Sequence, residues 1–297
     1  MYKALLAAVL LASPLLAAHP DTSSNRTVTR LPEVTTTATG PALAEERPVG
    51  ETGRPEWTSA RRFTTTRAYI QQDPWHIGVE QWWRLRDNRD DTIQNLFISE
   101  IEIGLPYRMQ LDLYENWVVD DERKAHHDNI AVELRWALAD WGKIPLNPTL
   151  YGEYKWVDKG SDVFEFKLLL ADQLAPRLHY AINFAYEKEF GNADRTAEFQ
   201  ISAGLSYSLI DSKVSLGVEA KYVRESTHFD RGEPEQKYLV GPSVQFRLTE
   251  RFHIDLACLF GTNNDAQRHE GWLIVGYDFG KIGGSPETYT PVSGQRH

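Results

Sequence analysis

Residues 213–222, KVSLGVEAKY, contain the pattern that decides the fold. Apolar side chains occupy every second position, and polar or small side chains lie between them. Because successive side chains of a β-strand point to opposite faces, this stretch predicts a strand with one apolar and one polar face. The pattern recurs at 97–105 (FISEIEIGL), 107–114 (YRMQLDLY) and 178–187 (LHYAINFAYE). The repeating unit is therefore a long amphipathic strand.

The whole patterned region, residues 75–280, predicts about twelve such strands of roughly 10–13 residues. Strands of soluble proteins usually run about 5–6 residues, whereas a tilted strand needs about 9–11 to cross a bilayer. Tight turns alternate with longer polar loops such as 119–128 and 225–236. Short periplasmic turns and longer outer loops are typical of outer-membrane barrels. We predict an all-β fold, an antiparallel up-and-down transmembrane β-barrel with both termini in the periplasm.

The two ends of the 297-residue chain differ from this region in composition. Residues 1–18 combine a basic start with a short apolar run, the layout of a signal peptide. Residues 19–74 are rich in Thr and Pro and have no apolar period, which predicts a disordered periplasmic tail. Residues 281–297 form a polar C-terminal tail. Together, the export signal and the barrel pattern predict the outer membrane of a Gram-negative bacterium.

One part of the N-terminal tail has a second interpretation. Residues 31–40 (LPEVTTTATG) resemble the segment that opens TonB-dependent receptors, in which a plug domain follows. Only about 35 residues lie between this segment and the first predicted strand, which excludes a full receptor by length. We therefore expect a Thr-rich tail rather than a plug domain.

The hairpins share a sequence motif. Glu100 to Leu113 reads E-x-x-x-G-L…R…L-x-L, a strand end, a tight turn, a basic residue and an alternating strand. This run resembles the outer-membrane transporter family of the MetA pathway of phenol degradation. The resemblance covers roughly residues 75–280. It implies an outer-membrane barrel with a transport function, and it transfers no functional residue.

The polar faces of the strands would line the barrel lumen. A soluble fold could not bury so many charges, but a water-filled lumen can hold them. Two interpretations stay open, a narrow polar path and a salt-bridge network that fills the barrel. The expected lumen-lining residues are Glu80, Arg84, Glu100, Glu102, Arg108, Asp112, Glu133, Arg135, Glu153, Lys155, Glu165, Lys167, Glu187, Glu219 and Lys221.

Aromatic residues recur near the strand ends on the apolar faces. On a lipid-facing wall they would form the aromatic girdles of the membrane interfaces, although packed core aromatics would give the same pattern. The expected girdle residues are Trp83, Trp117, Trp136, Trp156 and Tyr222.

The sequence offers little for enzyme chemistry. The single cysteine, Cys258, excludes a disulfide framework and a Cys₄ zinc site. The candidates for a rim hydrolase are His127 with Asp128 and His126 with Asp121, all in one polar loop. Polar loops need such residues in any case, so we expect no enzyme activity, no cofactor and no metal.

We predict that the function is passive movement of small solutes. The alternatives are a closed structural or interaction barrel and, with less support, a rim hydrolase. The expected partners are outer-membrane lipid, a small solute if the lumen is open, and the barrel-assembly machinery. A net charge of −10 argues against nucleic-acid binding, which depends on Lys and Arg.

Overall fold

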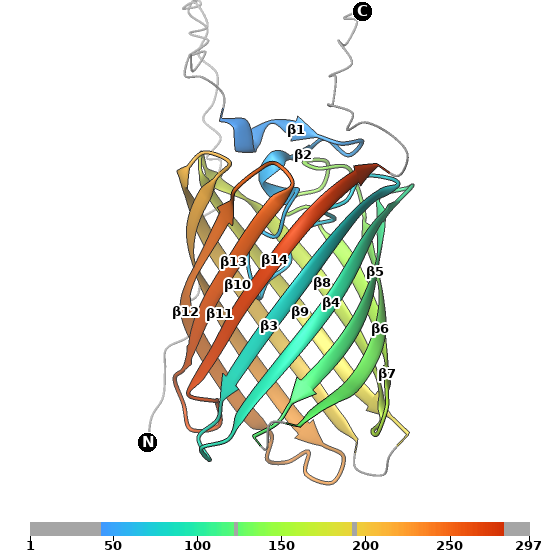
Figure 1. Ribbon diagram of the computed structural model, residues 1–297, viewed down its shortest axis with the longest axis vertical. Coiled ribbons are helices and arrows are strands. Elements are labelled where there is room, and N and C mark those ends of the chain that lie inside the picture. Colours follow the sequence, from blue (N-terminus) through green and yellow to red (C-terminus); the bar gives the residue numbers. More distant parts are fainter. Residues whose placement is uncertain (1–42, 122–123, 192–194, 282–297) are drawn as a thin grey trace, which may run out of the picture. The chain divides into compact units, whose positions relative to one another are not determined.

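The computed structural model describes residues 43–121, 124–191 and 195–281, in which twelve long strands form one closed barrel (Figure 1). Each strand pairs antiparallel with the next along the chain, and β14 pairs with β3 to close the sheet. The predicted up-and-down barrel of about twelve strands is therefore confirmed. The strands are β3 His76–Asp87, β4 Ile93–Leu105, β5 Met109–Val119, β6 Ala125–Ala137, β7 Thr149–Val157, β8 Asp162–Ala175, β9 Leu178–Phe190, β10 Thr196–Ile210, β11 Val214–Thr227, β12 Glu235–Arg247, β13 Phe252–Gly261 and β14 His269–Lys281.

The two ends of the barrel differ in their connections. At one end, here the turn end, β3 begins and the strands are joined by segments such as 106–108 and 211–213. At the other, the loop end, they are joined by segments such as 88–92 and 228–234. In the connection 106–108, Tyr107 and Arg108 both have positive φ, 64° and 63°, a backbone typical of tight hairpin turns and not of a strand. Strand β5 therefore begins at Met109 rather than at Tyr107.

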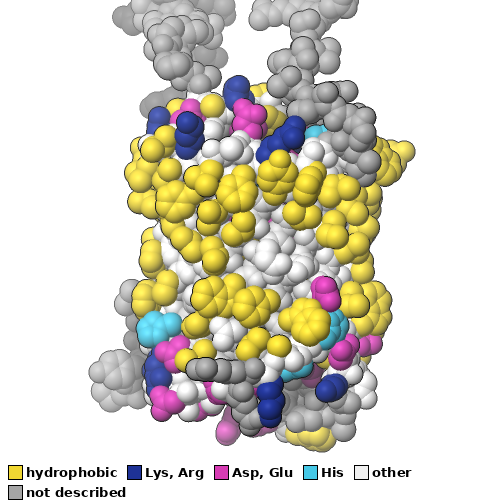
Figure 2. Space-filling view, in the orientation of Figure 1, with side chains coloured by type: hydrophobic (Ala, Val, Ile, Leu, Met, Phe, Trp, Pro, Cys, Tyr) yellow, Lys and Arg dark blue, Asp and Glu magenta, His cyan; other side chains and the backbone are white. Residues whose placement is uncertain are grey.

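The outer wall of the barrel is apolar. Large hydrophobic side chains that alternate with buried polar ones are exposed on every strand of the barrel, among them Leu113 and Val240. Figure 2 shows them in bands across the face in view, with charged side chains gathered toward both ends. An exposed apolar surface of this extent is typical of a lipid-facing wall.

The described part of the segment before the barrel, residues 43–74, is ordered, which corrects the prediction of a disordered tail for these residues. Residues 43–74, here the plug segment, contain η1 Ala44–Glu46, β1 Pro48–Val49, β2 Arg54–Pro55 and η2 Glu56–Thr58. β1 and β2 lie across the turn end, and the chain then descends into the barrel (Figure 1). Most of residues 57–72 are buried.

The structure does not test the remaining predictions for the two chain ends. Residues 19–42 of the expected tail, the signal peptide over 1–18 and residues 282–297 of the C-terminal tail lie outside the described residues. Among the described residues, no helix is long and apolar enough to cross a membrane.

Candidate functional site

The plug segment is tied to the barrel rim at its first residues. The Asp211 carboxylate, between β10 and β11, accepts the backbone N–H groups of Ala44 (2.7 Å) and Glu45 (3.0 Å). Partial burial raises the pKa of Asp211, but these two N–H donors outweigh it and lower the pKa below its usual value. The Glu45 side chain is buried, where its carboxylate accepts hydrogen bonds from the Ser208 hydroxyl and from Arg62 (3.4 Å).

Two aromatic side chains of the plug segment pack against the inner wall. Trp57 stacks on His179 with ring centroids 4.5 Å apart and meets Trp141 edge-on at 5.6 Å. Phe63 lies against β10 at Gly204, where a Cβ atom would overlap the phenyl ring. Both aromatic residues are 1% exposed. Burying a large apolar side chain contributes roughly 1.5–3 kcal/mol, so these rings are an apolar anchor for the segment.

Two arginines of the plug segment pair with carboxylates of the barrel. An Arg61 Nη2–Glu80 Oε2 distance of 2.9 Å and an Arg67 Nη2–Glu100 Oε1 distance of 2.9 Å define the two ion pairs. The Arg61 guanidinium also lies 4.1 Å from the centre of the Trp82 ring. All four charged side chains are buried. A buried carboxylate is costly without a partner, so the plug arginines are part of what allows these acids inside the barrel.

The irregular backbone of the plug segment is hydrogen-bonded by barrel side chains. The Glu219 carboxylate accepts the N–H groups of Thr64 (2.7 Å) and Thr65 (2.6 Å). The Asn183 side chain accepts the Arg67 N–H and donates to the Arg67 carbonyl, each at 2.7 Å. Buried backbone polar groups need such partners. Barrel side chains therefore provide the hydrogen-bond partners that the backbone of a neighbouring strand would provide in a sheet.

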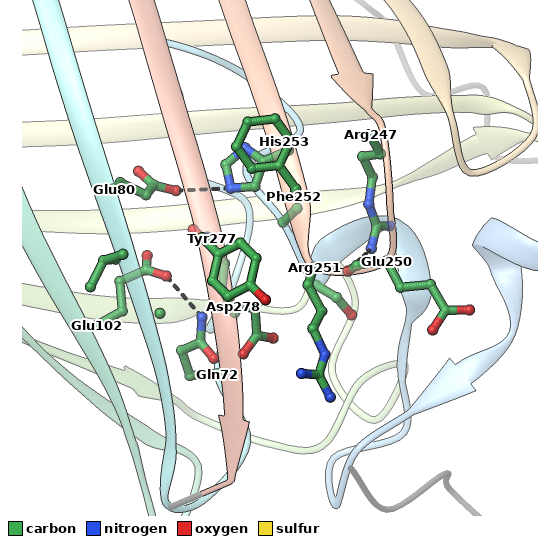
Figure 3. A pocket seen from close by; sticks show the side chains of 15 residues that line it. Gln72, Glu80, Glu102, Arg247, Glu250, Arg251, Phe252, His253, Tyr277 and Asp278 are labelled. Atoms are coloured by element: carbon green, nitrogen blue, oxygen red, sulfur yellow. Dashed lines mark hydrogen bonds and ion pairs between the residues drawn. The ribbon is translucent and has the colours of Figure 1, made fainter. Parts of the chain in front are cut away.

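The plug segment leaves almost no space between itself and the inward-facing side chains of β3, β4 and β13 at the turn end. In Figure 3 the Gln72 amide donates to Glu102 (2.9 Å), and His253 Nε2 lies 3.6 Å from a Glu80 oxygen. The cavity between these side chains measures about 10 Å³. That volume holds about one water molecule. The turn-end half of the barrel is therefore closed.

A fully buried charged cluster lies beside the plug segment. Arg135 pairs with Asp112 at 2.5 Å and with Glu133. The Tyr114 hydroxyl donates to Glu100 at 2.8 Å, and this joins the cluster to the acids that hold the plug segment. Such a network is rigid when all its members are paired.

A larger cavity, here the vestibule, fills the other half of the barrel. Its volume is about 510 Å³. Thr64 and Thr65 of the plug segment are part of its lining, and it reaches Arg86, Gln94 and Val157 near the loop end. The vestibule is therefore a polar chamber that ends on the plug segment.

One wall of the vestibule is cationic. Arg86 and Lys221 each contact the buried Glu270 carboxylate at 2.9 Å. Arg84 lies over the Trp272 ring, 5.5 Å from its centre, and has no ion-pair partner among the described residues. Two cations thus share one carboxylate, and the third, Arg84, lies beside them without an ion pair.

The opposite wall is acidic. Lys155 contacts Glu187 (2.6 Å), Glu153 (3.6 Å) and Glu165 (3.7 Å), and Lys167 also pairs with Glu165 (3.0 Å), so two ammonium groups serve three carboxylates. Glu198 also lines the vestibule and has no ion-pair partner in the described part of the chain. Because β3 and β14 lie across the barrel from β8 and β9, the two walls create an electric field across the vestibule.

The structure places the fifteen expected lumen residues in four groups. The plug segment is contacted by Glu80, Glu100, Glu102 and Glu219, and the buried cluster consists of Asp112, Glu133 and Arg135. The vestibule is lined by Arg84, Glu153, Lys155, Glu165, Lys167, Glu187 and Lys221. The fifteenth residue, Arg108, lies outside the interior.

The prediction for Arg108 is wrong. Its Nε donates to the Ala137 carbonyl at 3.2 Å, and its Nη1 lies 3.5 Å from Asp140, at the turn end. The alternation of β5 does not extend back to Tyr107 and Arg108, because these two residues form a positive-φ turn.

The five expected girdle residues lie on the outer wall. Trp83, Trp117, Trp136 and Trp156 are 40–49% exposed. Tyr222 is half-buried and packs against Tyr238, with ring centroids 4.9 Å apart. Trp136 pairs with Met109 near the turn end, whereas Trp83, Trp117, Trp156 and Tyr222 lie toward the loop end.

The plug residues escaped the sequence analysis. Trp57, Phe63, Tyr69 and Ile70 are four large apolar residues in a segment read as a Thr-rich tail. This number of large apolar residues was the sequence signal for an ordered segment, because disordered segments contain few aromatic residues.

The two His–Asp pairs considered for a rim hydrolase are not formed. His127 Nδ1 lies 2.8 Å from Asp158, on the neighbouring loop, rather than against Asp128. Asp121 accepts the backbone N–H of Ile93. His126 lies on β6 next to His127, and its side chain is exposed.

Three groups of carboxylate and imidazole side chains are close enough to hold a metal ion. They are Glu80–Glu100–Glu102, Glu100–Asp112–Glu133 and Glu45–Glu46–His179. Arginine already provides the positive charge in each group. Arg61 and Arg67 contact the first group, Arg135 contacts the second, and Arg62 contacts the third. We therefore assign no metal to them.

Comparisons with known proteins agree with this architecture. The family model described as "Putative MetA-pathway of phenol degradation" matches residues 157–272, which confirms the resemblance to this family, and the motif at residues 100–113 lies outside the match. No curated protein matches the chain.

Among solved structures, an outer membrane channel from Pseudomonas putida F1 is similar with a TM-score of 0.53 and 9% identity, over 71% of this chain and 98% of that one. The NanC porin has a TM-score of 0.47 and 11% identity, over 67% and 97% of the two chains. The KdgM porin has a TM-score of 0.46 and 9% identity, over 68% and 99%. The likeness to the channel establishes the fold of an outer-membrane barrel.

Proposed function

We propose that this protein is an outer-membrane channel for small solutes and that the plug segment closes it. The observation that carries the proposal is the vestibule, a polar chamber of about 510 Å³ that ends on residues 64 and 65 of the plug segment. A barrel built only for structure has no need of such a chamber. Among the described residues, the plug segment is the part of the chain that crosses the lumen in the turn-end half, so its removal would open that half.

The proposed orientation puts the turn end in the periplasm. Short turns on the periplasmic side and longer loops outside are usual for outer-membrane barrels. The two levels of exposed aromatic residues, at Trp136 and at Trp83, would then mark the two membrane interfaces. The plug segment would enter from the periplasmic side, and solutes would reach the vestibule from outside.

The vestibule favours small solutes that carry charge or a strong dipole. Arg84 and Glu198 are ionisable groups on its opposite walls without ion-pair partners among the described residues. A solute with separated charges could interact with both walls, whereas an apolar solute would only displace water from them. We propose passage without chemical conversion, because the rim histidines do not form the pairs that a hydrolase was expected to use.

Single-channel conductance in a planar bilayer tests the proposal. The full mature chain should be nearly silent, and a variant that lacks residues 43–74 should give regular current steps. Deletion of residues 22–41, which spares the plug segment, is the matched control and should stay silent. Heat-modifiable gel migration reports whether each barrel folds. A folded but silent variant without residues 43–74 would favour the closed structural barrel instead.

A further inference from the structure

A basic pocket lies on the outside of the barrel, at the loop end of β9, β10 and β11. Its volume is about 260 Å³. Four basic residues line it, Lys188, Arg195, Arg224 and Arg231, and the one acidic lining residue is Glu198. The lining therefore carries a clear excess of positive charge.

Strand alternation puts the pocket on the membrane-facing wall. Lys188 shares a face with Tyr186, which is 48% exposed, and Arg224 pairs directly with Phe199, which is 37% exposed. Phe199 in turn pairs with Tyr186. The basic residues thus begin where the aromatic side chains of the wall end, the depth at which lipid headgroups meet a barrel.

The four basic side chains have no acidic partner within the described residues. Arg231 contacts only the His228 ring, at 3.3 Å, and Lys188 lies over the Phe190 ring at 5.8 Å. The Nε atom of Arg195 is buried without a hydrogen-bond partner.

Two other basic side chains near the loop end are paired with acids. Arg268 contacts Asp91 at 2.5 Å, and Lys237 contacts Glu225 at 2.7 Å. Four unpaired cations in one pocket repel one another, and an anionic ligand would relieve that repulsion. The contrast with the paired residues indicates a ligand of opposite charge at this pocket.

We propose that this pocket binds a membrane lipid through a headgroup that carries two phosphates. Arg and Lys side chains are the usual phosphate ligands, and each phosphate monoester brings about −1.5 to −2 charges, enough to balance the four cations. The acyl chains would lie along the aromatic side chains of β9 and β10. The site would fix the barrel in the leaflet that surrounds its loop end.

Native mass spectrometry of the detergent-solubilised full chain tests the site, with diphosphoryl lipid A as the probe. Lys188→Gln/Arg224→Gln should weaken binding about 10- to 100-fold, because two charge-assisted contacts are lost. Lys159→Gln/Lys213→Gln, which removes two exposed lysines elsewhere, is the matched control and should bind like the parent chain.

Three results would overturn the proposal. They are equal binding of the probe by both double variants, equal binding of a phosphate-free lipid by the parent chain, and full displacement of the probe by millimolar inorganic phosphate, which would indicate a free-phosphate site. Heat-modifiable migration of Lys188→Gln/Arg224→Gln confirms that the variant is folded. None of these measurements depends on conductance.

Discussion

Asp112 and Leu113 are neighbours in the middle of β5, and they face opposite surroundings. The Asp112 side chain is fully buried and pairs with Arg135 at 2.5 Å, whereas Leu113 is 37% exposed on the outer wall. The strand alternation that the sequence predicts is thus realised residue by residue. The same alternation assigned Arg108 wrongly, because the backbone of a tight turn does not follow it.

A charge at Leu113 should be costly. In a transmembrane barrel an arginine on the lipid face near the bilayer midplane destabilises by about 2–4 kcal/mol. We expect Leu113→Arg to lower the free energy of unfolding by that amount, measured by reversible denaturation in lipid vesicles. Leu113→Ile is the control and should change it little. An unaltered unfolding free energy in Leu113→Arg would mean that this wall does not face lipid.

The strands and the plug segment differ in how far their sequences reveal them. A strand carries its signal locally, as a period of two over ten or more residues. The plug segment has no period, because its backbone bonds to side chains far along the chain: Thr64 to Glu219 and Arg67 to Asn183 are 155 and 116 residues apart. Composition alone therefore suggested a disordered tail. The interval of about 35 residues was judged too short for a plug domain, yet it suffices to close half of a twelve-stranded barrel.

The attachment of η1 to the rim should depend on pH. The pKa of Asp211 is lower in the folded state than in an unfolded chain, where it is about 3.9. The stabilisation by this carboxylate is therefore fully present above about pH 4 and is lost as the pH falls through the lower folded-state pKa. Hydrogen exchange of the amides of residues 44 and 45 should be slow at pH 6 and, corrected for intrinsic rates, less protected at pH 2.5.

Asp211→Asn separates this contact from other effects of acid. The amide is a weaker acceptor than the carboxylate and does not titrate, so protection at residues 44 and 45 should be reduced at pH 6 and nearly independent of pH. Asp230→Asn, in a loop at the opposite end, should leave the pH dependence intact. Unchanged protection in Asp211→Asn would show that the rim is held by other contacts.

On the scale of the whole molecule, the barrel and the plug segment balance each other's charge. The interior contains the acids Glu80, Glu100 and Glu102, and the plug segment brings Arg61 and Arg67 to them. The sequence is compatible with a lumen that is a narrow path and with one that a charged network fills. The structure has a filled turn-end half and, in the other half, a vestibule of about 510 Å³ that ends on the plug segment. That division could not be foreseen, because it depends on a segment without a strand pattern.

Removing the plug segment should therefore leave a cation-selective channel. The plug arginines would be gone, and Glu80, Glu100 and Glu102 would face water in the turn-end half of the lumen. Because pore selectivity follows the charge of the lining, the reversal potential of the variant without residues 43–74 in a KCl gradient should indicate a preference for K⁺. Adding Glu80→Gln, Glu100→Gln and Glu102→Gln should reduce the ratio of K⁺ to Cl⁻ permeability several-fold, whereas Glu233→Gln, in an exposed loop, should not. A preference that survives the triple substitution would place the selective charges in the vestibule rather than where the plug segment had been.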